Sequence, residues 1–249
     1  MVRLFAVAVG LSVMGSFGSL LLASVLLVLK PKTRLGLVPH LVSYAVGMLL
    51  GVALLSILPE VLGDLSPART GVVLLAGIMA FFILEKLVLW HHSHTEDCQT
   101  HDHPGRPGAL ILIGHAFHSF VDGVAIGAAV QTSVPLGVST AVAVALHEVP
   151  QQVGDFAVLL HAGYARRRAL GLSILSAAGA VAGTIAAFLA FASLPGVLPY
   201  ALAVAAASFL YISMADLIPD LHKGHVDAGA IEQFLLVLAG MLTAFWLRE

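Results

Sequence analysis

Long apolar runs alternate with short polar breaks along the whole chain. Eight of these runs reach the roughly 20 residues that a helix needs to cross the hydrocarbon core of a bilayer. The breaks between them are marked by proline or basic residues such as Pro31, Pro67, Pro135, Pro195 and Lys223. The predicted spans are residues 4–29, 39–62, 70–90, 109–131, 137–161, 169–191, 197–219 and 231–247. The pattern predicts an all-α, polytopic protein with eight transmembrane helices in one membrane domain, residues 1–249.

The composition supports a membrane protein rather than a soluble one. Of the 249 residues, 59% are hydrophobic and 10% are charged, whereas a soluble domain carries about 25% charged residues. The net charge of −2 favours no particular charged partner, and we expect no nucleic acid to bind. The first apolar run is longer than the roughly 7–15 apolar residues of a signal peptide. It is therefore interpreted as a membrane helix and not as a cleaved leader.

The distribution of basic residues predicts the orientation in the membrane. With eight spans both termini lie on one side, and successive loops alternate between the two sides. Nine of the twelve basic residues fall on the side opposite the termini: Lys30, Lys32, Arg34, Lys86, Arg106, Arg166, Arg167, Arg168 and Lys223. Because cytosolic loops carry the excess of Lys and Arg, both termini are predicted to lie outside. The longest loop, 91–108, is then cytosolic.

Polar side chains interrupt the fourth and fifth apolar spans near their centres. Charged side chains there cost roughly 2.5–3.5 kcal/mol each on insertion scales, so they indicate function. Neither span contains a Lys or Arg that would pair with the acids, which weakens a purely structural interpretation. The polar residues are His115, His118, Ser119 and Asp122 in the fourth span, and His147, Glu148, Gln151, Gln152 and Asp155 in the fifth.

The spacing of these residues predicts that the two clusters meet. Residues three and four apart share a helix face, so His118 and Asp122 form one stripe and His147 and Gln151 form another. The connection of residues 131–135 is short, which makes the two spans antiparallel neighbours. Imidazole and carboxylate donors together suit Zn²⁺ and related first-row ions. The sequence therefore predicts a divalent-cation site near the bilayer midplane.

Two motifs resemble those of the ZIP (Zrt/Irt-like) family of metal-ion transporters, most closely its His-rich subgroup. His118 to Gly127, with the sequence HSFVDGVAIG, resembles the family pattern HNxxDGxAIG. His147 to Asp155, with the sequence HEVPQQVGD, resembles HExPHExGD. The resemblance implies inward transport of Zn²⁺, or in some members Fe²⁺, Mn²⁺ or Cd²⁺, by alternating access. It also implies a metal site on spans four and five that is often binuclear.

Departures from these patterns bear on the predicted site. Ser119 stands for the family's Asn, and Gln151 and Gln152 stand for stronger or charged ligands. A second divalent ion near the first needs anionic bridging to offset the repulsion, which neutral amides do not supply. We therefore expect one principal ion held by His118, Asp122 and His147, with Gln151 or water completing the site. Glu148 is interpreted as an outer partner or the ligand of a weak second ion, and His115, Ser119, Gln152 and Asp155 as lining the metal path.

A histidine-rich segment separates the third and fourth spans. It carries three acids, the single cysteine and five histidines, namely His91, His92, His94, His101 and His103. Such tracts bind metal by composition, but this one lacks the paired spacing of a structural zinc module. Two interpretations stay open: a solvated loop that binds metal incidentally, and a cytosolic metal acceptor or sensor.

The alternatives to a transporter are a membrane metallohydrolase and a non-transporting metal sensor. His147 to Gln151 imitates H-E-x-x-H with Glu148 as the base, although Gln151 replaces the second His. We favour a transporter, not an enzyme, without a cofactor other than the metal ion that it moves. The expected partners are divalent metal ions and the lipid bilayer, and a homodimer is an open alternative to a monomer. The small size and short loops favour a bacterial plasma (inner) membrane.

Overall fold

The computed structural model describes residues 1–96, 106–161, 163–222 and 229–248, and every regular element in these ranges is a helix. This confirms the all-α prediction. In chain order the elements are α1 (Val2–Val28), α2 (Pro31–Gly51), η1 (Val52–Ile57), α3 (Leu58–Asp64), α4 (Pro67–Glu96), α5 (Arg106–Thr132), α6 (Val134–His161), α7 (Arg166–Ser193), η2 (Pro195–Val197), α8 (Leu198–Tyr211), η3 (Ile212–Leu217), α9 (Ile218–His222) and α10 (Gly229–Leu247).

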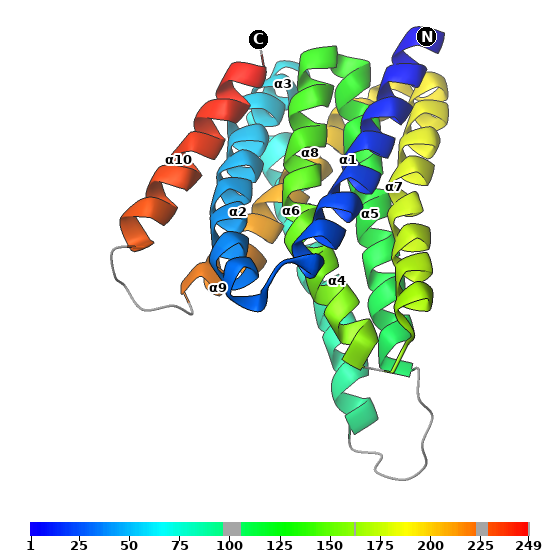
Figure 1. Cartoon of the computed structure of the whole chain (residues 1–249). Helices are drawn as coiled ribbons and strands as arrows, with labels where there is room; N and C mark the ends of the chain where they lie inside the picture. The colour runs from blue at the N-terminus through cyan, green and yellow to red at the C-terminus, as the bar shows by residue number, and fades with distance from the viewer. Residues whose placement is uncertain (97–105, 162, 223–228, 249) are drawn as a thin grey trace.

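The helices form a bundle with both termini at the same end (Figure 1). Seven helical segments within the described ranges are long and apolar enough to cross a bilayer, so the protein is an integral membrane protein. The remaining long helix, α6, has 28 residues but is not among the seven. Its polar residues, including His147 and Glu148, lower its hydropathy. With α6 the bundle matches the predicted eight spans approximately.

The segment predicted as the loop 91–108 differs in part from the structure. Helix α4 continues through Glu96, and α5 begins at Arg106. No Pro or Gly follows the apolar part of α4 before Pro104, so nothing in the sequence stops the helix where the apolar run ends. Residues 97–105, which include His101 and His103, lie outside the described residues.

Two long helices are each interrupted by one π-helical stretch. The stretch η1 lies between α2 and α3, and η3 lies between α8 and α9. Each is followed by a proline, Pro59 or Pro219, which has no N–H to bond the carbonyl four residues earlier. For Pro59 that carbonyl belongs to Leu55, and it accepts a hydrogen bond from Arg248 at 3.0 Å. Arg248, the residue after α10, thus donates to a carbonyl to which the proline cannot donate.

Small residues allow α5 and α7 to pack closely, and these two helices share the most extensive contact in the bundle. A methyl group on Gly123 would overlap the Ala180 carbonyl, and one on Gly183 would overlap the Phe120 carbonyl. Thr184 Oγ1 donates a hydrogen bond to the Gly123 carbonyl across the interface at 2.9 Å. Close backbone approach at small residues is the usual basis of helix association in membranes.

We expect Gly123→Ala to destabilise the bundle, because the added methyl group must push α5 away from α7. Overpacking of this kind costs typically about 1–3 kcal/mol. The matched control is Gly114→Ala on the same helix, where an added Cβ meets no atom within 4 Å. Thermal unfolding of the purified proteins in detergent should show a lower midpoint for Gly123→Ala and no loss for Gly114→Ala. Equal midpoints for the two variants would contradict the close packing.

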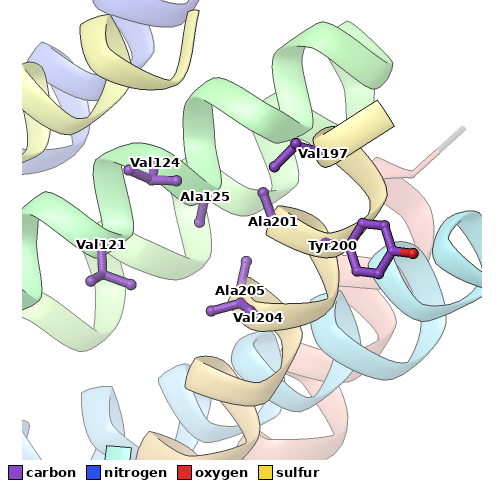
Figure 2. Close-up of a pocket in the computed structure, with 8 residues that line it drawn as sticks. All are labelled: Val121, Val124, Ala125, Val197, Tyr200, Ala201, Val204 and Ala205. Atoms are coloured by element: carbon purple, nitrogen blue, oxygen red, sulfur yellow. The ribbon is translucent and has the colours of Figure 1, made fainter. Parts of the chain in front are cut away.

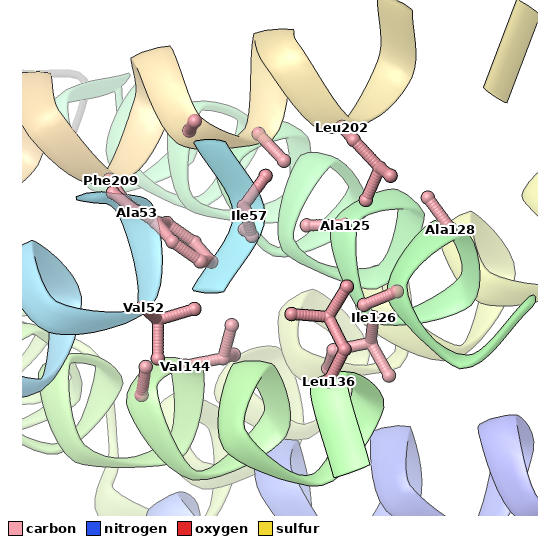
Figure 3. Close-up of a cluster of buried hydrophobic side chains, with 14 of the residues drawn as sticks. Val52, Ala53, Ile57, Ala125, Ile126, Ala128, Leu136, Val144, Leu202 and Phe209 are labelled. Carbon is pink, nitrogen blue, oxygen red and sulfur yellow. The ribbon is translucent and has the colours of Figure 1, made fainter. Parts of the chain in front are cut away.

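A buried apolar cluster lies where four helical segments of the bundle meet. It joins η1, α5, α6 and α8 through residues such as Val52, Ile57, Ile126, Val144 and Phe209 (Figure 3). These side chains are 0% exposed. The cluster holds the middle of α5 and α6, which carry the predicted ligands, against α8 and η1.

Candidate metal centre

Three predicted ligands from two neighbouring helices meet inside the bundle. His118 and Asp122 lie four residues apart on α5, and His147 lies on α6. Only Ser133 separates the two helices, so α5 and α6 run antiparallel and their central residues reach the same depth. Asp122 and His147 are buried, whereas the His118 side chain is 19% exposed. Among the described residues, these three form the one group of at least three His, Cys or acidic residues close enough to hold a metal.

The ligand atoms form a nearly regular triangle. His118 Nε2 lies 3.2 Å from His147 Nε2, and each nitrogen lies 3.4 Å from Asp122 Oδ2. Zinc bonds of about 2.0–2.1 Å in a tetrahedral site place neighbouring ligand atoms about 3.3–3.4 Å apart. The triangle therefore fits three corners of such a site. A tetrahedral ion held by these three atoms would take its fourth ligand from water or another side chain.

A hydrogen bond to the backbone and a contact with an aromatic ring restrain the orientation of the His147 imidazole. Its Nδ1 pairs with the Ala143 carbonyl at 3.0 Å, so Nδ1 carries the hydrogen and Nε2 presents its lone pair to the centre. Partners of this kind select the ligating tautomer in metal sites. The Phe209 ring on α8 packs beside the imidazole, with 6.4 Å between the ring centroids. His147 is thus held by a hydrogen bond on one side and by packing on the other.

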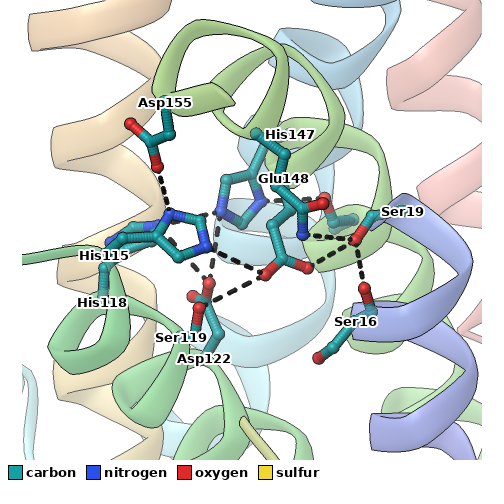
Figure 4. A network of polar contacts seen from close by, with 11 residues as sticks. Ser16, Ser19, His115, His118, Ser119, Asp122, His147, Glu148 and Asp155 are labelled. Atoms are coloured by element: carbon teal, nitrogen blue, oxygen red, sulfur yellow. Dashed lines mark hydrogen bonds and ion pairs between the residues drawn. The ribbon is translucent and has the colours of Figure 1, made fainter. Parts of the chain in front are cut away.

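Glu148 follows His147 in the sequence, but its carboxylate lies in a second polar group (Figure 4). Glu148 Oε2 accepts a hydrogen bond from Ser19 Oγ of α1 at 2.7 Å, and Oε1 accepts one from Ser119 Oγ of α5 at 3.3 Å. Gln152 donates to Ser19 Oγ at 3.2 Å. Glu148 is buried. Its carboxylate is therefore engaged by α1 and α5 and does not belong to the triangle of ligand atoms.

His115 lies between two acids of α6. Its Nδ1 is 2.8 Å from Asp155 Oδ2, and its Nε2 is 3.7 Å from Glu148 Oε1 (Figure 4). His115 is 5% exposed. The ring thus links α5 to α6 beside the triangle, with an acid at each nitrogen.

The other predicted site residues divide into two sets. Gln151 is half-buried one turn after His147 on α6 and lies on the same helix face. His91, His92 and His94 fall in the last turns of α4, where their side chains lie outside the described residues, as do His101 and His103. Helix spacing thus puts Gln151 on the face of His147, and the structure gives no placement for the five histidine side chains.

Ser19 and Phe209 were not predicted from the sequence. Ser19 belongs to a buried stripe on α1 that also contains Ser12 and Ser16. The spacing of four and three residues was a readable signal, because it places three hydroxyls on one face of an apolar helix. Phe209 carried no such signal, since it is one aromatic residue in an apolar run.

A separate apolar cavity of about 260 Å³ lies between α5 and α8 (Figure 2). Its walls include Val121 and Val124 of α5 and Tyr200 and Val204 of α8. The described residues that line it include no carboxylate, imidazole or thiol. It therefore lacks the donors of a metal site and is distinct from the polar centre.

Comparison with known proteins identifies the family. The family model described as "ZIP Zinc transporter" matches residues 91–248, more than half of the chain. The chain belongs to the ZIP family. The matched region contains both motifs and all three residues of the triangle.

Individual relatives agree with this assignment. Zinc transporter ZIP10 of Danio rerio is 37% identical over 139 residues, which cover 55% of this chain and 16% of that protein. Zinc transporter foi of Drosophila melanogaster is 38% identical over 134 residues, which cover 54% of this chain and 18% of that protein. Zinc transporter ZIP13 of Pongo abelii is 32% identical over 220 residues, covering 82% of this chain and 64% of that protein. The chain thus spans less than a fifth of the first two relatives.

The names of the relatives bear on the metallohydrolase alternative. The relatives are zinc transporters by name and not enzymes. The metallohydrolase hypothesis therefore has no support from this ZIP protein's relatives.

Proposed function

We propose that this ZIP protein carries zinc-like divalent cations into the cytosol by alternating access, with His118, Asp122 and His147 as the transport site. The observation that carries the proposal is the triangle of two imidazole nitrogens and one carboxylate oxygen, with sides of 3.2–3.4 Å. This donor set suits Zn²⁺ and other borderline ions. Its position in the middle of two membrane-spanning helices is where a transported ion must pass.

The composition of the site is consistent with an ion that enters and leaves. Three protein ligands leave one position of a tetrahedral ion for water or Gln151, in contrast to closed four-ligand structural zinc sites. The 19% exposure of His118 gives the centre an edge at which ligands can exchange. Fe²⁺, Mn²⁺ and Cd²⁺ are further candidate substrates for the same donors, and the inward direction follows from the family resemblance.

The orientation with both termini outside remains part of this proposal. It rests on the excess of basic residues on the opposite side of the membrane. Both termini lie at the same end of the bundle, which is compatible with this orientation (Figure 1). A bacterial inner membrane is the proposed location.

Uptake of radioactive zinc by cells that express the chain tests this proposal. We expect saturable inward uptake above that of cells with an empty vector, and its loss in His118→Ala at equal amounts of protein in the membrane. Competition by Fe²⁺, Mn²⁺ and Cd²⁺ in the same assay ranks the substrates. Uptake that His118→Ala leaves unchanged, or net zinc export, would contradict the proposal.

A further inference from the structure

Three polar side chains restrain the carboxylate of Glu148, which follows the predicted ligand His147 in the sequence. It is directed about 100° around α6 from His147 and is contacted from two other helices. The hydroxyls of Ser19 and Ser119 donate to it at 2.7 and 3.3 Å, and His115 Nε2 lies 3.7 Å away. A carboxylate buried in the membrane without such partners is strongly unfavourable. These contacts therefore determine the position of the Glu148 carboxylate relative to the triangle of ligand atoms.

His115 is the partner that links Glu148 to a second acid. Asp155 lies two turns after Glu148 on the same helix, and the imidazole of α5 is placed between the two carboxylates. Because each ring nitrogen faces an acid, His115 cannot bind a metal ion without giving up one of these contacts. The geometry thus argues against His115 as a ligand along the metal path. It favours a role in holding the two carboxylates in place.

We propose that His115 is a positioning residue that holds Glu148 away from the transported ion and keeps the centre mononuclear. This inference rests on the proposed function and deepens it. Without the ring, Glu148 and Asp155 would each lose their contact with the imidazole of α5. The buried carboxylate of Glu148 and the partly buried one of Asp155 then attract a cation more strongly than they would in water, because the local dielectric constant is lower. A second divalent ion would then occupy the space that the imidazole fills.

Further oxygen atoms are available to such a second ion. Gln152 shares Ser19 Oγ with Glu148, and its Oε1 is buried without a hydrogen-bond partner among the described residues. Carboxylate and amide oxygens together form a site for a hard or borderline divalent cation. His115 thus determines how many ions the region holds.

The test is the number of Co²⁺ ions bound per purified full-length chain, measured by titration and by the visible absorption of bound Co²⁺. We expect His115→Ala to bind one ion more than the wild type. His115→Ala combined with Glu148→Gln should return to the wild-type number, because the released carboxylate is then neutral. His115→Gln, whose amide still donates to Glu148, should also keep the wild-type number. Ions held elsewhere on the chain are common to all variants and cancel in the comparison.

A separate arm distinguishes this inference from the proposed function. His118→Ala should bind one ion fewer than the wild type. If it loses none, the proposed centre is wrong and the role of His115 falls with it. If His118→Ala loses one ion but His115→Ala gains none, only the positioning role is overturned. Should His115→Ala not fold, His115→Ser, which also opens the space, is measured with the same expectation and the same contradicting result.

Discussion

Asp122→Asn is expected to lower the zinc affinity of the purified protein by at least about 100-fold. Asp122 supplies the only anionic corner of the triangle, through an oxygen 3.4 Å from each imidazole nitrogen. Changes in the outer partners of metal ligands already cost about 10–100-fold, so the loss of a charged ligand should cost at least as much. Isothermal titration with zinc measures the change.

Asp64→Asn provides the matched control for this experiment. It makes the same chemical change at an exposed acid of α3, outside the polar centre. The control should bind zinc at the centre as the wild type does. An Asp122→Asn protein that is folded and keeps wild-type zinc affinity would remove Asp122 from the ligand set.

Phe209→Ala is expected to cause the largest loss of stability among single changes near the centre. Phe209 is 0% exposed, packs in the main apolar cluster and contacts His147. Truncation of a buried Phe to Ala typically costs about 3–5 kcal/mol, because a cavity replaces the ring. Thermal unfolding in detergent should show a markedly lower midpoint, and zinc affinity should also fall as His147 loses its packing.

Phe234→Ala is the control for this change. Phe234 on α10 is 65% exposed and faces away from the bundle core, so its truncation leaves no internal cavity. We expect its midpoint to stay close to that of the wild type. A Phe209→Ala protein as stable as Phe234→Ala would show that the cluster does not support the centre.

Much of the fold and the candidate centre could be predicted from the sequence because helical periodicity is simple. Runs of about 20 apolar residues gave the spans, and the spacing of four residues put His118 and Asp122 on one face. The short connection at Ser133 then placed His147 opposite them. These local rules were sufficient for the three residues of the triangle, because all three lie on two consecutive helices.

Features that depend on distant parts of the chain could not be predicted in the same way. The sequence placed Glu148 beside His147, but its hydrogen bond to Ser19 joins residues 129 positions apart. The bond from Arg248 to the Leu55 carbonyl depends on how α10 packs against α2. The π-helical stretches η1 and η3 also have no periodicity signal, although the prolines that follow them mark where carbonyls are left free.

An anomalous difference map at the zinc absorption edge, from crystals of the zinc-loaded protein, locates the bound ion. We expect a peak about 2.0–2.2 Å from His118 Nε2, His147 Nε2 and an oxygen of Asp122. We also expect the carboxylate of Glu148 to stay with Ser19 and Ser119. Zinc bound elsewhere on the chain, with no peak between these three residues, would show that His118, Asp122 and His147 do not form the metal centre.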